Sequence, residues 1–136
     1  LPLPAGLLDA VLLQLALEVV ADGEGATRVG CARVVEAASR EEAELAARAI
    51  ANSPLVKTAL FGHDPNWGRV AQAAGMALVG TELPELGLDH IDAGEFASDL
   101  EEAEVKLRLG RGSHAAHVWF SDLNYEYVRI NAEYTT

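Results

Sequence analysis

Cysteine and basic residues are both scarce in this sequence of 136 residues, and each shortage excludes something. The single cysteine, Cys31, rules out an internal disulfide and suits a reducing compartment, where such a residue is most often a small buried hydrophobe. Only 10 lysines and arginines stand against 21 aspartates and glutamates, which gives a net charge of −11. Because this charge repels phosphate groups, we expect neither a nucleic-acid partner nor binding to an anionic membrane. A cytoplasmic protein is the simplest expectation.

A long uninterrupted apolar run is also missing. The stretch 7–20 is too short to cross a membrane and contains Asp9, Gln14 and Glu18, so we expect it to form a helix buried against protein. No basic segment precedes this stretch, so no secretory signal is evident. Half of all residues are hydrophobic, which suits one globular domain over residues 1–136 with a modest core.

Periodicity and capping signals predict the elements of the first part of the chain. A helix is predicted over 5–21, where apolar residues recur at helical spacing, and Gly23 would end it. A strand is predicted over 26–37, with an irregularity near Gly30. A serine followed three residues later by a glutamate has the spacing of a capping box, and this predicts a helix over 40–52.

The segment from Ser53 to Arg69 is the most informative stretch. Its apolar run at 55–61 predicts a buried strand, which would close a β-α-β unit with the preceding strand and helix. Asp64 before a proline starts a turn, and Asn66 can cap a helix over 66–78. Free backbone N–H groups beside charged side chains often hold a carboxylate or a phosphate. Alternatively, the two polar side chains only satisfy backbone donors, while the tryptophan that follows fills a gap.

The sequence pattern of the second half of the chain predicts a loop followed by two strands. Residues 81–99 contain a proline, two glycines and six acidic residues, so we expect them to be mostly loop. Alternating apolar residues predict strands over 105–109 and 114–121, joined by a glycine-containing turn into a hairpin. The expected fold class is therefore α+β, a mixed β-sheet packed against helices.

A last helix is predicted near the end of the sequence. Asp122 would cap this helix, which would run through Asn131. The spacing of Tyr125 and Val128 places both on one face, which we expect to be the inner face.

Single polar residues suggest further site hypotheses. His114 and His117 lie three residues apart on a predicted strand and would point to opposite faces, so we expect no shared metal. His63 could act as a base, but a histidine at a turn is more often a hydrogen-bonded surface group. The acidic cluster between 82 and 104 is expected to be solvated rather than metal-binding. Glu24 lies between two glycines, which could aim its carboxylate at a ligand or simply form a solvated turn.

Three motifs, in this order, resemble the ornithine acetyltransferase family, whose members are also called glutamate N-acetyltransferases. They are DGEGAT at 22–27, the segment that begins SPLVKTA and ends DPNWGR at 53–69, and DLNYEYVRINAEYTT at 122–136. Nearly the whole chain is therefore similar to the C-terminal part of the β chain of that family. The resemblance implies a portion of a larger, self-cleaved enzyme of the N-terminal-nucleophile type, built from an α and a β chain.

The resemblance also implies a reaction, a site and partners. Acetyl would move from N-acetylornithine to glutamate by a ping-pong mechanism through an acetyl-threonine intermediate, a step in arginine biosynthesis. Glu24, Asn131 and Thr136 match family positions that bind the amino-acid substrate. No metal or organic cofactor is implied. The implied partner is the α chain of the same precursor, in a heterotetramer of two α and two β chains.

The sequence departs from the family pattern in two places. Position 1 is Leu1, whereas the family's β chain begins with the nucleophilic threonine, and the first hydroxyl-bearing residue here is Thr27. We therefore expect no catalytic residue within this chain as given and a nucleophile outside it. The alternative is a noncatalytic amino-acid-binding or interaction module derived from the family. The stretch between Gly80 and Asp99 also looks shorter than its family counterpart, where additional strand would be expected.

Overall fold

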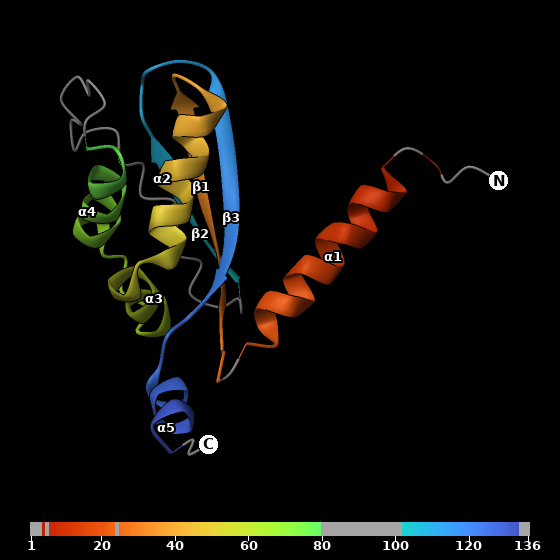
Figure 1. Ribbon diagram of the computed structural model, residues 1–136, viewed down its shortest axis with the longest axis vertical. Coiled ribbons are helices and arrows are strands. Elements are labelled where there is room, and N and C mark those ends of the chain that lie inside the picture. Colours follow the sequence, from red (N-terminus) through yellow and green to blue (C-terminus); the bar gives the residue numbers. More distant parts are fainter. Residues whose placement is uncertain (1–3, 5, 24, 80–101, 134–136) are drawn as a thin grey trace.

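A computed structural model describes residues 4, 6–23, 25–79 and 102–133 of the chain, and it confirms the expected α+β class (Figure 1). The strands form one mixed sheet in the order β2-β1-β3. Helix α2 packs against β1 and β3, and α4 packs against α2. The elements are, in chain order, α1 Leu7–Ala21, β1 Val29–Ala37, α2 Arg40–Asn52, α3 Pro54–Phe61, α4 Trp67–Ala77, β2 Glu102–Arg108, β3 His114–Ser121 and α5 Tyr125–Glu133. The expected loop at 81–99, and the shortening inferred there, lie outside the described residues.

The predicted hairpin between the last two strands is wrong, although both strands exist. Strand β1 lies between them, parallel to β2 and antiparallel to β3. The connection from β2 to β3 crosses the end of β1, where the Leu109 N–H donates to Val35 O at 3.1 Å and the Arg111 N–H donates to Glu36 O at 2.8 Å. Strand β1 takes the centre because it is the most apolar of the three, with Ala32 and Val34 fully buried, and a central strand pairs along both edges.

The irregularity in β1 lies further along the strand than predicted. Pairing is regular at Gly30, which lies opposite Ala103 on one side and Phe120 on the other. The register shifts instead between Val34 and Ala37. Gly30 serves a packing role, because a Cβ at this position would lie 2.7 Å from the Phe120 ring.

The predicted strand at 55–61 is wrong, because this segment is helix α3. Ser53 caps the helix by accepting from the Val56 N–H at 3.4 Å, and a proline occupies the first turn, where its missing N–H costs nothing. A short apolar run fits a buried strand and a buried helix equally well, and here Val56 and Leu60 are buried at helical spacing. The β-α-β unit is therefore closed by β2 and not by this segment.

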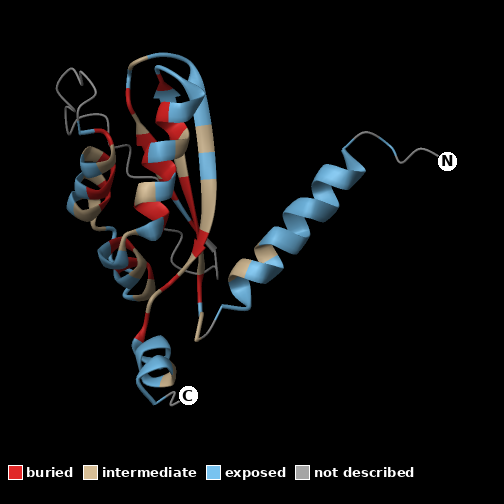
Figure 2. Cartoon of the chain, viewed as in Figure 1, coloured by how far each residue is buried: buried red, intermediate tan, exposed pale blue. Residues whose placement is uncertain are grey.

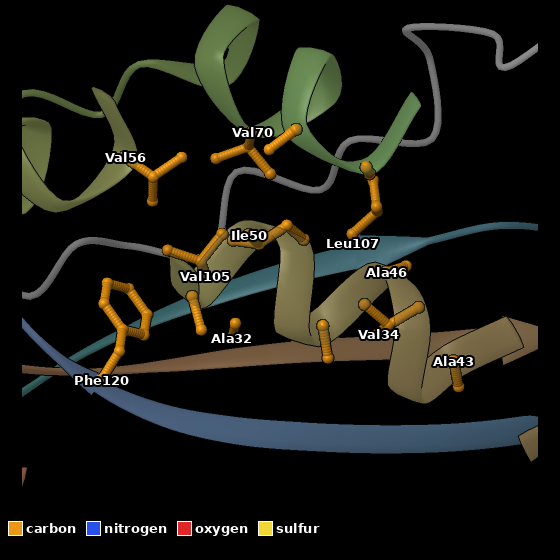
Figure 3. Close-up of a cluster of buried hydrophobic side chains, with 14 of the residues drawn as sticks. Ala32, Val34, Ala43, Ala46, Ile50, Val56, Val70, Val105, Leu107 and Phe120 are labelled. Carbon is orange, nitrogen blue, oxygen red and sulfur yellow. The ribbon is translucent and has the colours of Figure 1, made fainter. Parts of the chain in front are cut away.

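Helix α2 is confirmed, and it supplies the apolar layer over the sheet. Ser39 accepts from the Glu42 N–H at 3.1 Å, as the capping-box spacing predicts. The alanine-rich face of the helix lies close to the sheet because its side chains are small. Ile50, near the end of the same helix, is fully buried. Figure 3 shows these side chains meeting residues of the strands, with Val56 and Val70 approaching from α3 and α4.

Helix α1 forms where predicted but is not buried within the described chain. None of its residues is buried, and Figure 2 shows it extending from the body as an almost wholly exposed helix. Leu12 is 53% exposed and Val19 is 74% exposed. Its apolar residues surround most of the helix, and the described part of the chain supplies only a few contacts from β1 and β3 at its end. In the portion of the chain that the structure describes, no helix combines the length and the apolar character that crossing a membrane requires.

The fit of Phe120 against Gly30 gives a stability prediction. Substitution Gly30→Ala should lower the free energy of unfolding by about 1–3 kcal/mol, because the added methyl overlaps the ring and Leu60 as well. Gly75→Ala is the matched control, since its Cβ would meet nothing within 4 Å and alanine favours the helix. Urea unfolding followed by circular dichroism measures both changes. Equal stability of the two variants would contradict this packing.

Candidate functional site

The turn before β1 and the start of α5 lie at the same end of the sheet (Figure 1). A cluster of hydrogen-bonded polar groups joins them, and we call it the Asp122 junction. Asp122 lies at its centre and is only 4% exposed as a residue. Its Oδ1 accepts from the Thr27 N–H at 2.8 Å and from the Arg28 N–H at 2.9 Å. Its Oδ2 accepts from the Thr27 hydroxyl at 2.6 Å. The junction consists of Gly25, Thr27, Arg28, Asp122 and Asn124.

Asn124 completes the junction and caps α5. Its Nδ2 donates to Gly25 O at 2.6 Å and to Asp122 Oδ2 at 3.0 Å, and its Oδ1 accepts from the Tyr127 N–H at 3.0 Å. The prediction that Asp122 caps this helix is therefore wrong. The helix begins two residues later than expected, and the Asp122 side chain accepts hydrogen bonds from Thr27 and Arg28 instead.

Gly25 brings the turn into direct contact with α5. Its φ of +70° lies in the left-handed region, which favours glycine. A Cβ at this position would lie 2.8 Å from the backbone nitrogen of Tyr127. A larger residue at position 25 would therefore force the turn and the helix apart.

Helix α3 supports the junction from a third side. The Arg28 guanidinium donates through Nη1 to Leu60 O at 2.7 Å, and the Leu123 N–H donates to Lys57 O at 3.2 Å. The Lys57 ammonium lies 5.9 Å from the centroid of the Phe120 ring. Burial lowers the pKa of Lys57, while the nearby Asp122 carboxylate opposes that shift.

Opposing effects also act on the pKa of Asp122. Burial alone would raise it, but the hydrogen bonds from the Thr27 hydroxyl, the Arg28 and Thr27 N–H groups and the Asn124 amide bring the pKa below its ordinary value. The carboxylate is therefore held in its charged form, and it fixes two segments of the chain that are far apart in sequence.

Of the three predicted substrate-binding residues, the structure describes one. Asn131 lies exposed on α5, and its Nδ2 donates to Tyr127 O at 2.8 Å. Glu24 and Thr136 lie outside the described residues. The structure nevertheless brings Gly25, the residue that follows Glu24, against the helix that carries Asn131.

The predicted inner face of α5 is exposed in the described chain. Tyr125 is 84% exposed and Val128 is 58% exposed. Tyr125 still meets Phe61 of α3 edge to face, with 5.9 Å between ring centroids. The helix is anchored through its capped first turn, and its outer turns are open to other protein or to a ligand.

Sequence reasoning missed the junction itself. It assigned Asp122 to a local cap and gave Thr27 and Asn124 no role. The available signal was an Asp-x-Asn pair before a helix, in which either residue can cap. The choice between them depends on knowing that Asp122 bonds to Thr27, which lies 95 residues earlier in the chain.

The conspicuous segment at 53–69 uses its polar groups locally. The Asn66 amide donates to Asp64 Oδ2 at 3.0 Å, and its Oδ1 accepts from the Arg69 N–H at 3.2 Å, which confirms the cap of α4. Arg69 Nη1 donates to Leu55 O at 2.9 Å. Trp67 packs against the core cluster. These contacts support the structural alternative over a carboxylate or phosphate site. Within the described part of the chain, no group of three histidine, cysteine, aspartate or glutamate side chains could hold a metal ion.

Known proteins resemble this chain in both sequence and fold. The model of the ArgJ family matches residues 5–136. The chain belongs to the ArgJ family. It is 45% identical over 142 residues to the glutamate N-acetyltransferase of Methanosarcina acetivorans, covering 90% of this chain and 36% of the relative. It is 46% identical over 143 residues to the arginine biosynthesis bifunctional protein ArgJ of Thermus thermophilus, covering 94% of this chain and 37% of the relative.

A solved structure agrees with the fold. The crystal structure of the arginine biosynthesis bifunctional protein ArgJ from Bacillus halodurans superposes with a TM-score of 0.78 at 32% identity, covering 93% of this chain and 67% of that chain. The family resemblance inferred from the three motifs is therefore confirmed. The chain spans somewhat more than a third of the length of the curated ArgJ relatives named above.

The lowered pKa of Asp122 predicts a pH-dependent contribution to stability. A carboxylate with a lowered folded-state pKa stabilises the fold fully above its unfolded pKa, about 3.9, and loses this contribution as the pH falls through the folded value. Asp122→Asn should therefore cost about 1–3 kcal/mol at neutral pH and less in acid. Urea unfolding at several pH values measures this difference.

The matched control is Glu44→Gln, which removes a carboxylate from a surface pair with Arg40. Its cost should stay below about 0.5 kcal/mol at every pH, since surface pairs contribute little. A cost of Asp122→Asn that stays constant from neutral to acidic pH would contradict the charged role of Asp122.

Proposed function

We propose that this chain is a β-subunit portion of a glutamate N-acetyltransferase, which moves acetyl from N-acetylornithine to glutamate. The names of the ArgJ relatives, glutamate N-acetyltransferase and arginine biosynthesis bifunctional protein, support this proposal. The observation that carries it is the contact between the Gly25 turn and α5, because it unites the two motifs that the family resemblance connects with substrate binding. A cytoplasmic location remains part of the proposal, since a single cysteine suits a reducing compartment.

The proposed reaction runs in two halves on a threonine outside this chain. In the first half, the threonine hydroxyl oxygen bonds to the acetyl carbon of N-acetylornithine, and the amide nitrogen takes a proton and leaves as the amine of ornithine. In the second half, the amine of glutamate attacks the acetyl-threonine ester, which releases the threonine hydroxyl and N-acetylglutamate. The residues of this chain supply binding and orientation rather than bond making.

Each substrate-binding residue has a chemical role in this proposal. The Glu24 carboxylate would pair with a substrate ammonium, a charge-assisted hydrogen bond. The Asn131 amide and the Thr136 hydroxyl or backbone would bind other polar groups of the amino acid. Binding energy from groups remote from the carbonyl helps hold the carbonyl against the nucleophile.

Helix α1 supports the proposed assembly with an α chain. Seven of its apolar side chains are at least 43% exposed in the described chain, which is unusual for a helix in water. In a full-length member of the family, residues outside the part that this chain matches would cover this surface. We propose that the α chain of the same precursor does so, in a heterotetramer of two α and two β chains.

Substitution at the predicted site tests the proposed function directly. Glu24→Gln and Asn131→Ala should each lower kcat/KM for acetyl exchange between N-acetylornithine and glutamate about 10-fold to 100-fold, because each removes one polar contact to the substrate. Exchange is measured with isotopically labelled acetyl, and trapping an acetylated threonine by mass spectrometry tests the ping-pong route.

The matched control is Glu104→Gln, which removes an exposed carboxylate paired with Arg33 and should leave exchange unchanged. Wild-type enzyme that shows no exchange would contradict the acetyltransferase proposal. Wild-type enzyme that instead binds glutamate or ornithine without turnover would favour the noncatalytic amino-acid-binding module.

The assembly is tested on α1. The pair Leu8→Gln and Leu12→Gln should weaken association with the α chain at least about tenfold, since burying a leucine contributes roughly 1.5–3 kcal/mol. Size-exclusion chromatography with intact mass spectrometry measures the assembled fraction. Gln14→Ala on the same helix is the control, and equal assembly of both variants would contradict the proposed contact.

A further inference from the structure

The Asp122 junction contains buried polar side chains that the proposed reaction does not yet use. Asp122 and Asn124 are both almost fully buried, yet neither belongs to the apolar core. Burying a carboxylate and an amide is costly unless both are fully hydrogen-bonded. An apolar pair could pack two segments together, but it could not fix their register to one hydrogen-bonded arrangement.

Four side-chain hydrogen bonds of the junction cross between the same two segments, residues 25–28 and residues 122–124. Asp122 accepts from the N–H groups of Thr27 and Arg28, and the Asn124 amide donates to Gly25 O. The same Asn124 side chain caps α5, because its Oδ1 accepts from the Tyr127 N–H. One amide therefore sets the position of the turn and the start of the helix together. A displacement of either segment would break bonds to the other.

We propose that Asp122 and Asn124 are positioning residues for the amino-acid substrate, and that they act by setting the separation between the Gly25 turn and α5. This inference rests on the proposed function, which places substrate contacts on the residue before Gly25 and on Asn131. Loss of the link should weaken recognition of the amino-acid part of the substrate. It should leave the reactivity of the nucleophile toward a small acetyl donor intact.

The sharpest test is Asn124→Asp in the complete enzyme. The new carboxylate keeps an acceptor for the Tyr127 N–H, so the cap of α5 is retained. It lacks the N–H groups that now donate to Gly25 O and to Asp122, and it places negative charge against both acceptors. The substitution therefore removes the Asn124 bond between the two segments and repels Asp122 at the other bonds, while keeping the helix start.

Two readouts separate positioning from general damage. With N-acetylornithine and glutamate, kcat/KM should fall about tenfold or more, mainly through a higher KM. Acetylation of the threonine by p-nitrophenyl acetate, which has no amino-acid group, should change less than about twofold. In that reaction the threonine oxygen bonds to the acetyl carbon and nitrophenolate leaves.

A second variant covers the case in which Asn124→Asp does not fold. Thr27→Val keeps the side-chain shape and both backbone bonds to Asp122 but removes the hydroxyl bond. It should show the same split between the two donors with a smaller effect, about threefold. Glu44→Gln is the control that should change neither reaction.

The outcomes distinguish this inference from the proposed function. A wild-type enzyme without acetyl exchange would overturn the proposed function, and the inference with it. Wild-type exchange with an equal loss on both donors in the variants would assign the junction a purely structural role and overturn the inference alone. Unchanged KM values in both folded variants would do the same.

Discussion

The structure depends on one buried carboxylate. Asp122 accepts four hydrogen bonds and joins the turn before β1 to the segment that leads from β3 into α5. Because both of its oxygens are satisfied and the charged form is favoured, the burial of its charge is compensated within the junction. Besides Asp122, the Asn124 bond to Gly25 O, the Leu123 N–H bond to Lys57 O and the edge contact of Tyr125 with Phe61 hold α5 to the body.

The sequence predicted those elements whose signals are local. Ser39 and Asn66 lie at the starts of α2 and α4, and each accepts the backbone N–H that its position predicts. Helix α3 was mistaken for a strand because a short apolar run has no diagnostic period. The order of the sheet depends on which backbones meet across long sequence separations, and the hairpin expectation considered only neighbours in the chain.

The site was predictable only in part, for the same reason. Family motifs identified Glu24, Asn131 and Thr136 as substrate-binding candidates, and only Asn131 lies among the described residues. The partner of Asp122 lies 95 residues away, so neither periodicity nor capping rules could reveal that contact. The exposed apolar surface of α1 has a related cause, since periodicity predicts that a helix must be covered but does not identify the covering segment.

The central claim is that the Asp122 junction aligns two segments around an amino-acid substrate. A crystal structure of the complete enzyme with bound ornithine or N-acetylglutamate tests it most directly. The account predicts that the amino acid lies between the Gly25 turn and α5, in contact with Glu24 and Asn131, with the bonds from Thr27 and Arg28 to Asp122 intact. An amino acid bound away from both segments, or bound between them with those bonds broken, would contradict it.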